Sequence, residues 1–261
     1  EVVQDFDATG ITAGFDYRRS TRWVLGGAVG YNKFESGLTD SGGLDTSGFT
    51  LTGYSAYYVS DSTYFDTRFS YGSVDLDQSR RLVINLTGYT LDDTLTSSTK
   101  ADQLSFAASF GHHISRGAWT LTPNAFVRYM HSNVDGFAEE GSDLAVEYSD
   151  QTVKSTVFGV GLQVSRVFSL SNGVLVPQFD LVWNQETGND DTEIDARYVL
   201  GDAGEFFSLR PETPDNSYGS VGVGLTYVLA NGKQAYLQWR ESVGLDGLDR
   251  STVNLGARFE F

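Results

Sequence analysis

The sequence predicts an all-β protein, a transmembrane antiparallel up-and-down β-barrel. Short segments along the whole chain alternate between apolar residues and small or polar residues, which is the period-2 pattern of strands. The connections between these segments alternate between short and long, as in outer-membrane barrels. The last segment keeps the alternation up to the final residue, Phe261. In water such an apolar strand edge promotes aggregation, whereas a closed barrel in lipid pairs the edge and covers the apolar face.

Bulk composition agrees with this fold class. Hydrophobic residues make up 40% of the 261 residues, and no apolar run approaches the roughly 20 residues that a spanning helix needs. Strands of a barrel are apolar only at alternate positions, so their overall hydrophobicity is modest. Aromatic residues, at 13%, are abundant enough for girdles at the membrane interfaces. No signal peptide is visible at Glu1, and we interpret residues 1–261 as one barrel domain.

About eleven segments carry the alternation. In the segment that follows the first turn, Trp23, Leu25 and Val29 alternate with small or polar residues. The later segments repeat this pattern with an aromatic residue near their ends. The predicted strands are residues 11–17, 23–31, 49–59, 64–75, 104–110, 119–131, 158–164, 175–183, 221–227, 235–239 and 251–261.

Five connections are short, and Asn172-Gly173 and Asn231-Gly232 among them are strong hairpin signals. The long connections are residues 37–48, 76–101, 133–154 and 186–216, with a shorter one at 244–250. Within 76–101, the apolar residues Leu82–Leu86 are expected to extend a hairpin beyond the membrane. Outer-membrane barrels have short periplasmic turns and long extracellular loops, so the C-terminus is expected in the periplasm.

The strand count itself makes a prediction. Eleven strands would place Glu1 and Phe261 on opposite sides of the membrane. Single-chain bacterial barrels have an even number of strands. We therefore expect about twelve strands, with the first one upstream of Glu1 or missing.

A soluble β-sandwich or propeller also has short strands. Either fold would bury its large apolar residues and expose its polar ones. Here the alternate positions that lack large apolar residues are rich in Gly, Ala and Ser, which suits the crowded interior of a barrel. A membrane barrel is the better interpretation.

Several segments resemble the β-domain of an autotransporter, the type V secretion system. An early strand, Gly10-Ile-Thr-Ala-Gly-Phe-Asp-Tyr-Arg, precedes Trp23-Val-Leu-Gly-Gly-Ala-Val-Gly-Tyr. Two strand starts carry Pro, in Leu121-Thr-Pro-Asn-Ala and Leu175-Val-Pro-Gln-Phe, and proline there indicates a bulge or strand end. Asn133-Val-Asp-Gly-Phe resembles the start of a loop in this family. The order and spacing of the matches carry the resemblance. Its terminal match is Val253-Asn-Leu-Gly-Ala-Arg-Phe-Glu-Phe.

The resemblance implies an anchor that lets an N-terminal passenger cross the outer membrane, joined to it by a helix through the pore. This sequence contains neither the passenger nor that helix. The implied partners are outer-membrane lipid and lipopolysaccharide, the barrel-assembly machinery, and a passenger segment or other protein in the pore. The implied assembly signal is the alternating apolar set of the terminal strand: Val253, Leu255, Ala257, Phe259 and Phe261. Two alternatives stay open, a stand-alone pore or channel and a structural barrel that docks a partner protein.

Charged residues on the polar parity are expected to face the water-filled lumen, because charges facing lipid are costly. They could contact a threaded segment or ions, or they could brace the wall through ion pairs. The candidates are Asp16, Arg68, Asn124, Arg128, Gln178, Asp180, Arg240 and Arg258.

No enzymatic chemistry is expected. By topology His112 and His113 lie near the periplasmic rim and His131 near the outer rim, so they cannot converge. A Gly-x-Ser-x-Gly motif is absent. No cofactor is expected, and the net charge of −16 argues against nucleic acid as a partner.

The long connections are rich in carboxylates that could bind divalent cations, but no calcium-loop spacing appears. These residues are Asp135, Glu139, Glu140, Asp143, Glu147, Asp190, Asp191, Glu193 and Asp195. We interpret them as a solvated face repelled from lipopolysaccharide or bridged to it by cations. No metal site is predicted.

Overall fold

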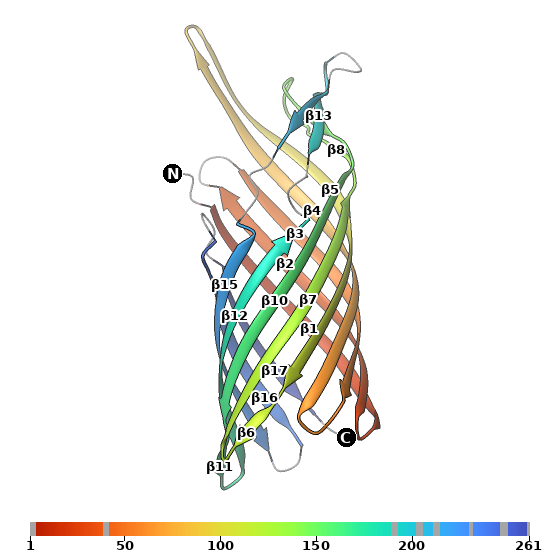
Figure 1. Ribbon diagram of the computed structural model, residues 1–261. Helices are drawn as coiled ribbons and strands as arrows, with labels where there is room; N and C mark the ends of the chain where they lie inside the picture. Colours follow the sequence, from red (N-terminus) through yellow and green to blue (C-terminus); the bar gives the residue numbers. More distant parts are fainter. Residues whose placement is uncertain are drawn as a thin grey trace.

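The computed structural model describes residues 4–38, 42–188, 193–201, 206–210, 215–229, 232–245 and 250–259. Figure 1 shows their strands as a tilted, curved wall whose order in space follows the order in sequence. Each wall strand pairs antiparallel with the next. The wall strands of the described chain are β1 (Gln4–Ser20), β2 (Trp23–Leu38), β3 (Gly42–Tyr58), β4 (Thr63–Leu86), β5 (Tyr89–His112), β7 (Trp119–Val134), β10 (Gln151–Arg166), β12 (Gly173–Thr187), β15 (Ser217–Leu229), β16 (Gln234–Val243) and β17 (Ser251–Arg258). The predicted all-β up-and-down fold, with eleven visible strands, is confirmed.

Alternate residues of each strand point to opposite faces of the wall, as the sequence pattern predicts. Leu255 is 80% exposed and Phe158 is 51% exposed, because both side chains point outward. Asn254, next to Leu255 in β17, lines an internal cavity instead. Among the described residues, no helix is long and apolar enough to cross a membrane.

The wall has a short-turn end and a long-loop end. At the long-loop end, residues 37–48 are mostly strand, since β2 and β3 stay paired as far as Leu38 and Gly42. The expectation of a loop there was wrong: glycine and serine lower strand propensity, but the ladder between the two neighbouring strands overrides it. The expected extension through residues 82–86 is confirmed. β4 and β5 remain paired up to Leu86 and Tyr89, and this β4–β5 hairpin rises beyond the rest of the wall in Figure 1.

Two prolines interrupt the ladder near the short-turn end in the same way. The register places His112 opposite Pro123, between the pairs Gly111–Asn124 and Ile114–Leu121. It also places Arg166 opposite Pro177. Proline has no N–H to donate, so the strand that faces it, β5 or β10, breaks there and resumes as a short piece. These pieces are β6 (Ile114–Arg116) and β11 (Phe168–Leu170). β7 and β12, which carry the two prolines, continue through them without a break, so the expected strand end lies in the partner strand and not in the proline-bearing segment.

A second, four-stranded sheet lies at the long-loop end, beside the β4–β5 hairpin (Figure 1). We call it the loop sheet. It consists of β8 (Phe137–Ala138), β9 (Val146–Tyr148), β13 (Ile194–Tyr198) and β14 (Phe207–Leu209). Residues 133–154 and 186–216, expected as loops, thus contain strands, which are too short to show a period in the sequence.

The loop sheet has a compact core. Leu95 of β5, Ala145, Val146 and Ala196 are all buried. Backbone hydrogen bonds between Thr96 and Glu140 join the loop sheet to the hairpin. Because the apolar residues of the wall mostly face outward, this core stabilises the loop sheet and its contact with β5 rather than the wall.

β1 and β17 are the two edges of the wall. Both run toward the short-turn end, because an odd number of antiparallel strands makes the first and last parallel. In the part of the chain that the structure describes, no hydrogen-bonded ladder joins them. We call the gap between β1 and β17 the seam.

Candidate functional site

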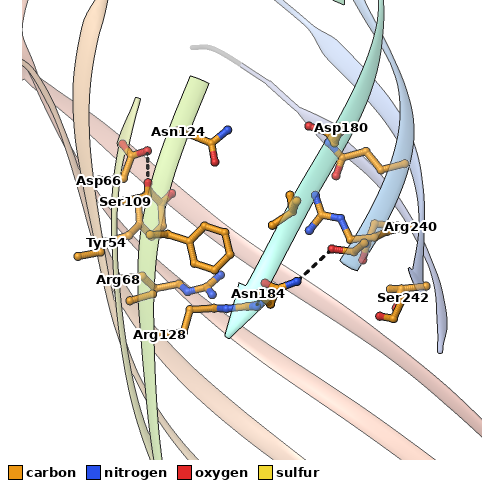
Figure 2. A pocket seen from close by; sticks show the side chains of 18 of the residues that line it. Tyr54, Asp66, Arg68, Ser109, Asn124, Arg128, Asp180, Asn184, Arg240 and Ser242 are labelled. Carbon is orange, nitrogen blue, oxygen red and sulfur yellow. Dashed lines mark hydrogen bonds between the residues drawn. The ribbon is translucent and has the colours of Figure 1, made fainter. Parts of the chain in front are cut away.

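The inner face of the wall encloses a cavity of about 680 Å³. Side chains from β3, β4, β5, β7, β12, β15, β16 and β17 line it, so segments distant in sequence converge there (Figure 2). Five of the residues that the sequence placed in the lumen line this cavity: Arg68, Asn124, Arg128, Asp180 and Arg240.

The other three candidates lie elsewhere. Gln178 lies in β12 opposite Gly224, where an added Cβ would lie 2.6 Å from the Gln178 amide nitrogen. Asp16 and Arg258 face each other across the seam, with Arg258 Nη2 donating to Asp16 Oδ2 at 2.7 Å. The structure therefore divides the predicted set between a central cavity, a packed wall position and the seam.

The sequence analysis missed other charged or polar residues that line the cavity, among them Tyr54, Asp66, Asn184 and Arg250. Asn184 shares the parity of Asp180, so the alternation could have identified it. Arg250 precedes the last strand in a connection without period-2 pattern, so no sequence signal pointed to it.

The cavity carries an excess of positive charge. Four arginines line it, Arg68, Arg128, Arg240 and Arg250, against two aspartates. The positive charges of the other three arginines repel that of Arg128. Among the described residues, no ion pair joins an arginine of this cavity to a carboxylate.

Neutral groups take the hydrogen bonds that carboxylates could have taken. Arg128 Nη2 donates to Asn184 Oδ1 at 3.3 Å. Gln163 Nε2 donates to Asp180 Oδ1 at 2.9 Å. Ser109 Oγ donates to Asp66 Oδ2 at 3.3 Å, as Figure 2 shows. Most guanidinium donors of the cavity are therefore available to an acceptor that enters it.

Aromatic rings on the inner face lie over glycines of the adjacent strand. Tyr54 pairs in register with Gly26, and Phe126 with Gly159. An ideal Cβ on either glycine would lie 2.1 Å from the ring. Tyr64 over Gly111 and Tyr236 over Gly256 repeat the arrangement. Glycine at these positions lets a large ring lie flat on the wall, which keeps the lumen open beside it.

The histidines show no catalytic arrangement. His112 Nδ1 and Thr63 Oγ1 are 2.8 Å apart, and His113 Nδ1 and Thr122 Oγ1 are 2.9 Å apart. His131 lies in register with Lys154, farther along the wall toward the long-loop end. Within the described residues, no group of three potential metal ligands comes together.

Arginines pair with several carboxylates at the long-loop end. Glu139 accepts two hydrogen bonds from Arg80, at 2.8 and 2.6 Å, and one from the Val146 N–H at 3.0 Å. Glu147 pairs with Arg197 at 2.7 Å, and Glu193 approaches Arg210 at 3.7 Å. Asp190 and Asp191 lie outside the described residues. These ion pairs order the loop sheet and do not form a cation site.

The terminal apolar set lies at the outer face of an edge strand. Val253, Leu255 and Ala257 belong to β17, and their side chains are exposed, as is that of Phe259. Phe261 lies outside the described residues.

Comparisons with known proteins give a consistent match. The family model described as autotransporter beta-domain matches residues 4–240. The chain is similar to the translocator domain of autotransporter NalP from Neisseria meningitidis, with a TM-score of 0.76 and 18% identity over 100% of this chain and 82% of that one. It is also similar to the beta domain of the Bordetella autotransporter BrkA, with a TM-score of 0.68 and 19% identity over 100% of this chain and 92% of that one. Among curated proteins, none matches the sequence at a significant level.

Proposed function

The chain belongs to the autotransporter beta-domain family and is an outer-membrane translocator barrel, and from this premise we propose that a passenger segment lies in its lumen against the arginine cavity. The observation that carries the proposal is the cavity itself. It lies on the inner face of the wall, it is lined by side chains of eight strands, and none of its four arginines forms an ion pair with a described residue.

Charge complementarity indicates which groups of the passenger segment would bind the cavity. A guanidinium presents several N–H donors in a plane that suits a carboxylate. Asp66 and Asp180 line the cavity but hydrogen-bond to Ser109 and Gln163. A carboxylate or carbonyl-rich part of the passenger segment would supply the missing acceptors for Arg68, Arg128 and Arg240.

Site-specific photocrosslinking tests this proposal. A photoreactive phenylalanine analogue at Asn124 faces the cavity, and the same analogue at Ala125, the next residue of β7, faces outward. In cells that make the passenger-joined protein, Asn124 should crosslink to the passenger segment and Ala125 should not. Equal crosslinking at both positions, or none at Asn124, would contradict the proposal.

We further propose that one more strand fills the seam. An all-antiparallel barrel needs an even number of strands, and β1 and β17 are parallel. One strand between them would pair antiparallel with both. We place the short turns and the C-terminus in the periplasm and the long loops outside, because outer-membrane barrels have short periplasmic turns and long extracellular loops.

Cysteine crosslinking across the seam tests the extra strand. Disulfides form only when Cα atoms lie within about 7 Å. Two strands separated by a third are about 9.5 Å apart, twice the usual strand spacing. Cysteines at Thr12 and Asn254 should therefore fail to form a disulfide, whereas cysteines at the register partners Thr12 and Gly30, where an added Cβ would lie 4.0 Å from the Thr12 Cβ, should form one. A Thr12–Asn254 disulfide would show that β1 and β17 pair directly.

Two further assignments complete the proposal. The outward apolar set of β17, with Phe261, is the signal that the barrel-assembly machinery binds. The chain has no catalytic activity of its own, and its role is transport and anchoring. Leu255→Asp in the signal should reduce the amount of folded barrel in the outer membrane, and Asn254→Asp, the neighbouring lumen-facing change, should reduce it much less.

A further inference from the structure

Arginines flank an outward-facing tryptophan at the short-turn end. Trp119 is the first residue of β7 and is 51% exposed. In register it lies opposite Arg116 of β6 on one side and Arg166 of β10 on the other. Register partners of an antiparallel pair point to the same face, so all three side chains lie on the outer surface.

Two aromatic rings lie close to the guanidinium of Arg166. Its Cζ atom lies 5.1 Å from the ring centroid of Trp119 and 4.7 Å from that of Phe168. Stacking occupies the faces of a guanidinium and leaves its N–H groups available along the edge. The aromatic pair thus orients the donors of Arg166 without consuming them.

The site has positive charge and no counter-ion from the described chain. Neither Arg116 nor Arg166 forms an ion pair among the residues that the structure describes. A second pair at the same end repeats the chemistry, with Arg19 Cζ 5.4 Å from the Trp23 ring centroid.

The position of the site on the wall indicates which kind of anion would bind there. Ile114 and Leu121, which pair in register next to the site, are exposed apolar residues of the outer face. The arginines therefore lie where the apolar band meets the polar turn. Tryptophan prefers this interfacial level, and cations near it are attracted to anionic lipid head groups.

We propose that Arg116 and Arg166, with Trp119 between them, form a binding site for the phosphate of a glycerophospholipid head group. The choice of a glycerophospholipid over lipid A rests on the proposed orientation, in which the short turns face the periplasm. The phosphate accepts hydrogen bonds from both guanidinium groups, and the acyl chains lie along Leu121 and the outer face of the wall.

Native mass spectrometry of the delipidated barrel tests the site. The barrel is titrated with phosphatidylglycerol, with diacylglycerol, which lacks the phosphate, and with lipid A. We expect phosphatidylglycerol adducts on the unmodified barrel. The double variant Arg116→Gln/Arg166→Gln should bind phosphatidylglycerol at least tenfold more weakly.

Two control variants sharpen the result. Arg81→Gln/Arg210→Gln removes the same charge at the opposite end and should leave phosphatidylglycerol binding unchanged. Arg116→Lys/Arg166→Lys keeps the charge and should retain part of the binding. Unfolded barrel migrates more slowly than folded barrel on unheated gels, so gel migration shows whether any variant fails to fold. If the double glutamine variant fails to fold, Trp119→Leu is used as the second variant.

Several outcomes would overturn the proposal. Undiminished phosphatidylglycerol binding by the glutamine variant would exclude these arginines, and equal binding of diacylglycerol would exclude the phosphate. Arginine-dependent preference for lipid A would exclude the glycerophospholipid and reverse the orientation. None of these results affects the photocrosslink at Asn124, so the lumen proposal is tested separately.

Discussion

Arg258 of the last strand donates a 2.7 Å hydrogen bond to Asp16 of the first strand, across 242 positions of sequence. This ion pair crosses the seam, where no ladder joins β1 and β17 within the described chain. It therefore links the two edges through side chains. The hydroxyl of Tyr54 lies beside it and donates to the Phe15 carbonyl at 3.3 Å.

The first prediction concerns this ion pair. Asp16→Asn or Arg258→Gln should destabilise the barrel by at most about 1 kcal/mol, because both side chains are partly exposed to lumen water. The measurement is the urea midpoint of the folded barrel in detergent. The charge swap Asp16→Arg/Arg258→Asp should recover part of the loss, and no recovery would show that the two charges are not coupled.

A second prediction uses the glycine beneath Phe126. Gly159→Ala adds a Cβ 2.1 Å from the ring and should cost about 1–3 kcal/mol through overpacking. Gly53→Ala is the matched control, since nothing lies within 4 Å of its added Cβ and alanine restricts the unfolded chain. Combined with Phe126→Ala, the Gly159→Ala change should cost less than the sum of the two. Additive costs would contradict the contact.

The third prediction addresses the loop sheet. Glu139→Ala removes the acceptor of Arg80 and of the Val146 N–H and should cost about 1–3 kcal/mol locally. Only 5% of the Glu139 side chain is exposed, so water cannot replace the lost contacts. Hydrogen exchange of β9 amides should accelerate while the amides of β12 stay protected. Equal acceleration of both would mean that the loop sheet and the wall unfold together.

The hairpin tip gives a pH prediction. Hydrogen bonds from Arg81, at 2.7 and 2.6 Å, hold the pKa of Asp92 below its ordinary value of 3.8. A lowered pKa in the folded state means that the contact stabilises the tip above pH 3.8 and is lost as the pH falls through the lowered value. A carboxyl-carbon NMR titration should show this lowered pKa, and Arg81→Gln should return it to the ordinary value. An unchanged titration in the variant would exclude Arg81 as the cause.

The fifth prediction concerns ion selectivity. With four arginines and two aspartates, the cavity of the passenger-free barrel should favour anions. The reversal potential in a KCl gradient measures this preference. Arg128→Gln/Arg240→Gln should shift it toward cations, and Arg81→Gln, at the distant hairpin tip, should leave it unchanged. A cation-selective unmodified barrel would contradict the charge assignment.

The strands of the wall could be predicted from the sequence, because period-2 alternation specifies both the strand and the face to which each side chain points. That logic placed Leu255 outward and Asn254 inward. It also allowed Asp180 and Arg240 to be assigned to the lumen before any contact was known. The prolines were informative as well, since a missing N–H has a direct structural consequence opposite His112 and Arg166.

The loop sheet could not be predicted, because its strands have two to five residues and its order depends on contacts between distant loops. Glu139 looked like one more solvated carboxylate until Arg80, 59 residues away, was found to pair with it. Arg250 shows the same limit for the cavity. The pattern assigns a face only within a strand, and Arg250 reaches the lumen from a connection.

The length of the β4–β5 hairpin determines how far its tip extends from the membrane surface. β4 and β5 have 24 residues each. About ten residues of each strand cross a bilayer, so the remaining roughly 14 at about 3.4 Å each place the tip about 48 Å farther along the strand. In the proposed orientation, an antibody or a phage meets Leu86 and Tyr89 before it meets lipid. The tip is therefore a suitable place to insert an epitope tag, because it lies far from the residues that line the lumen.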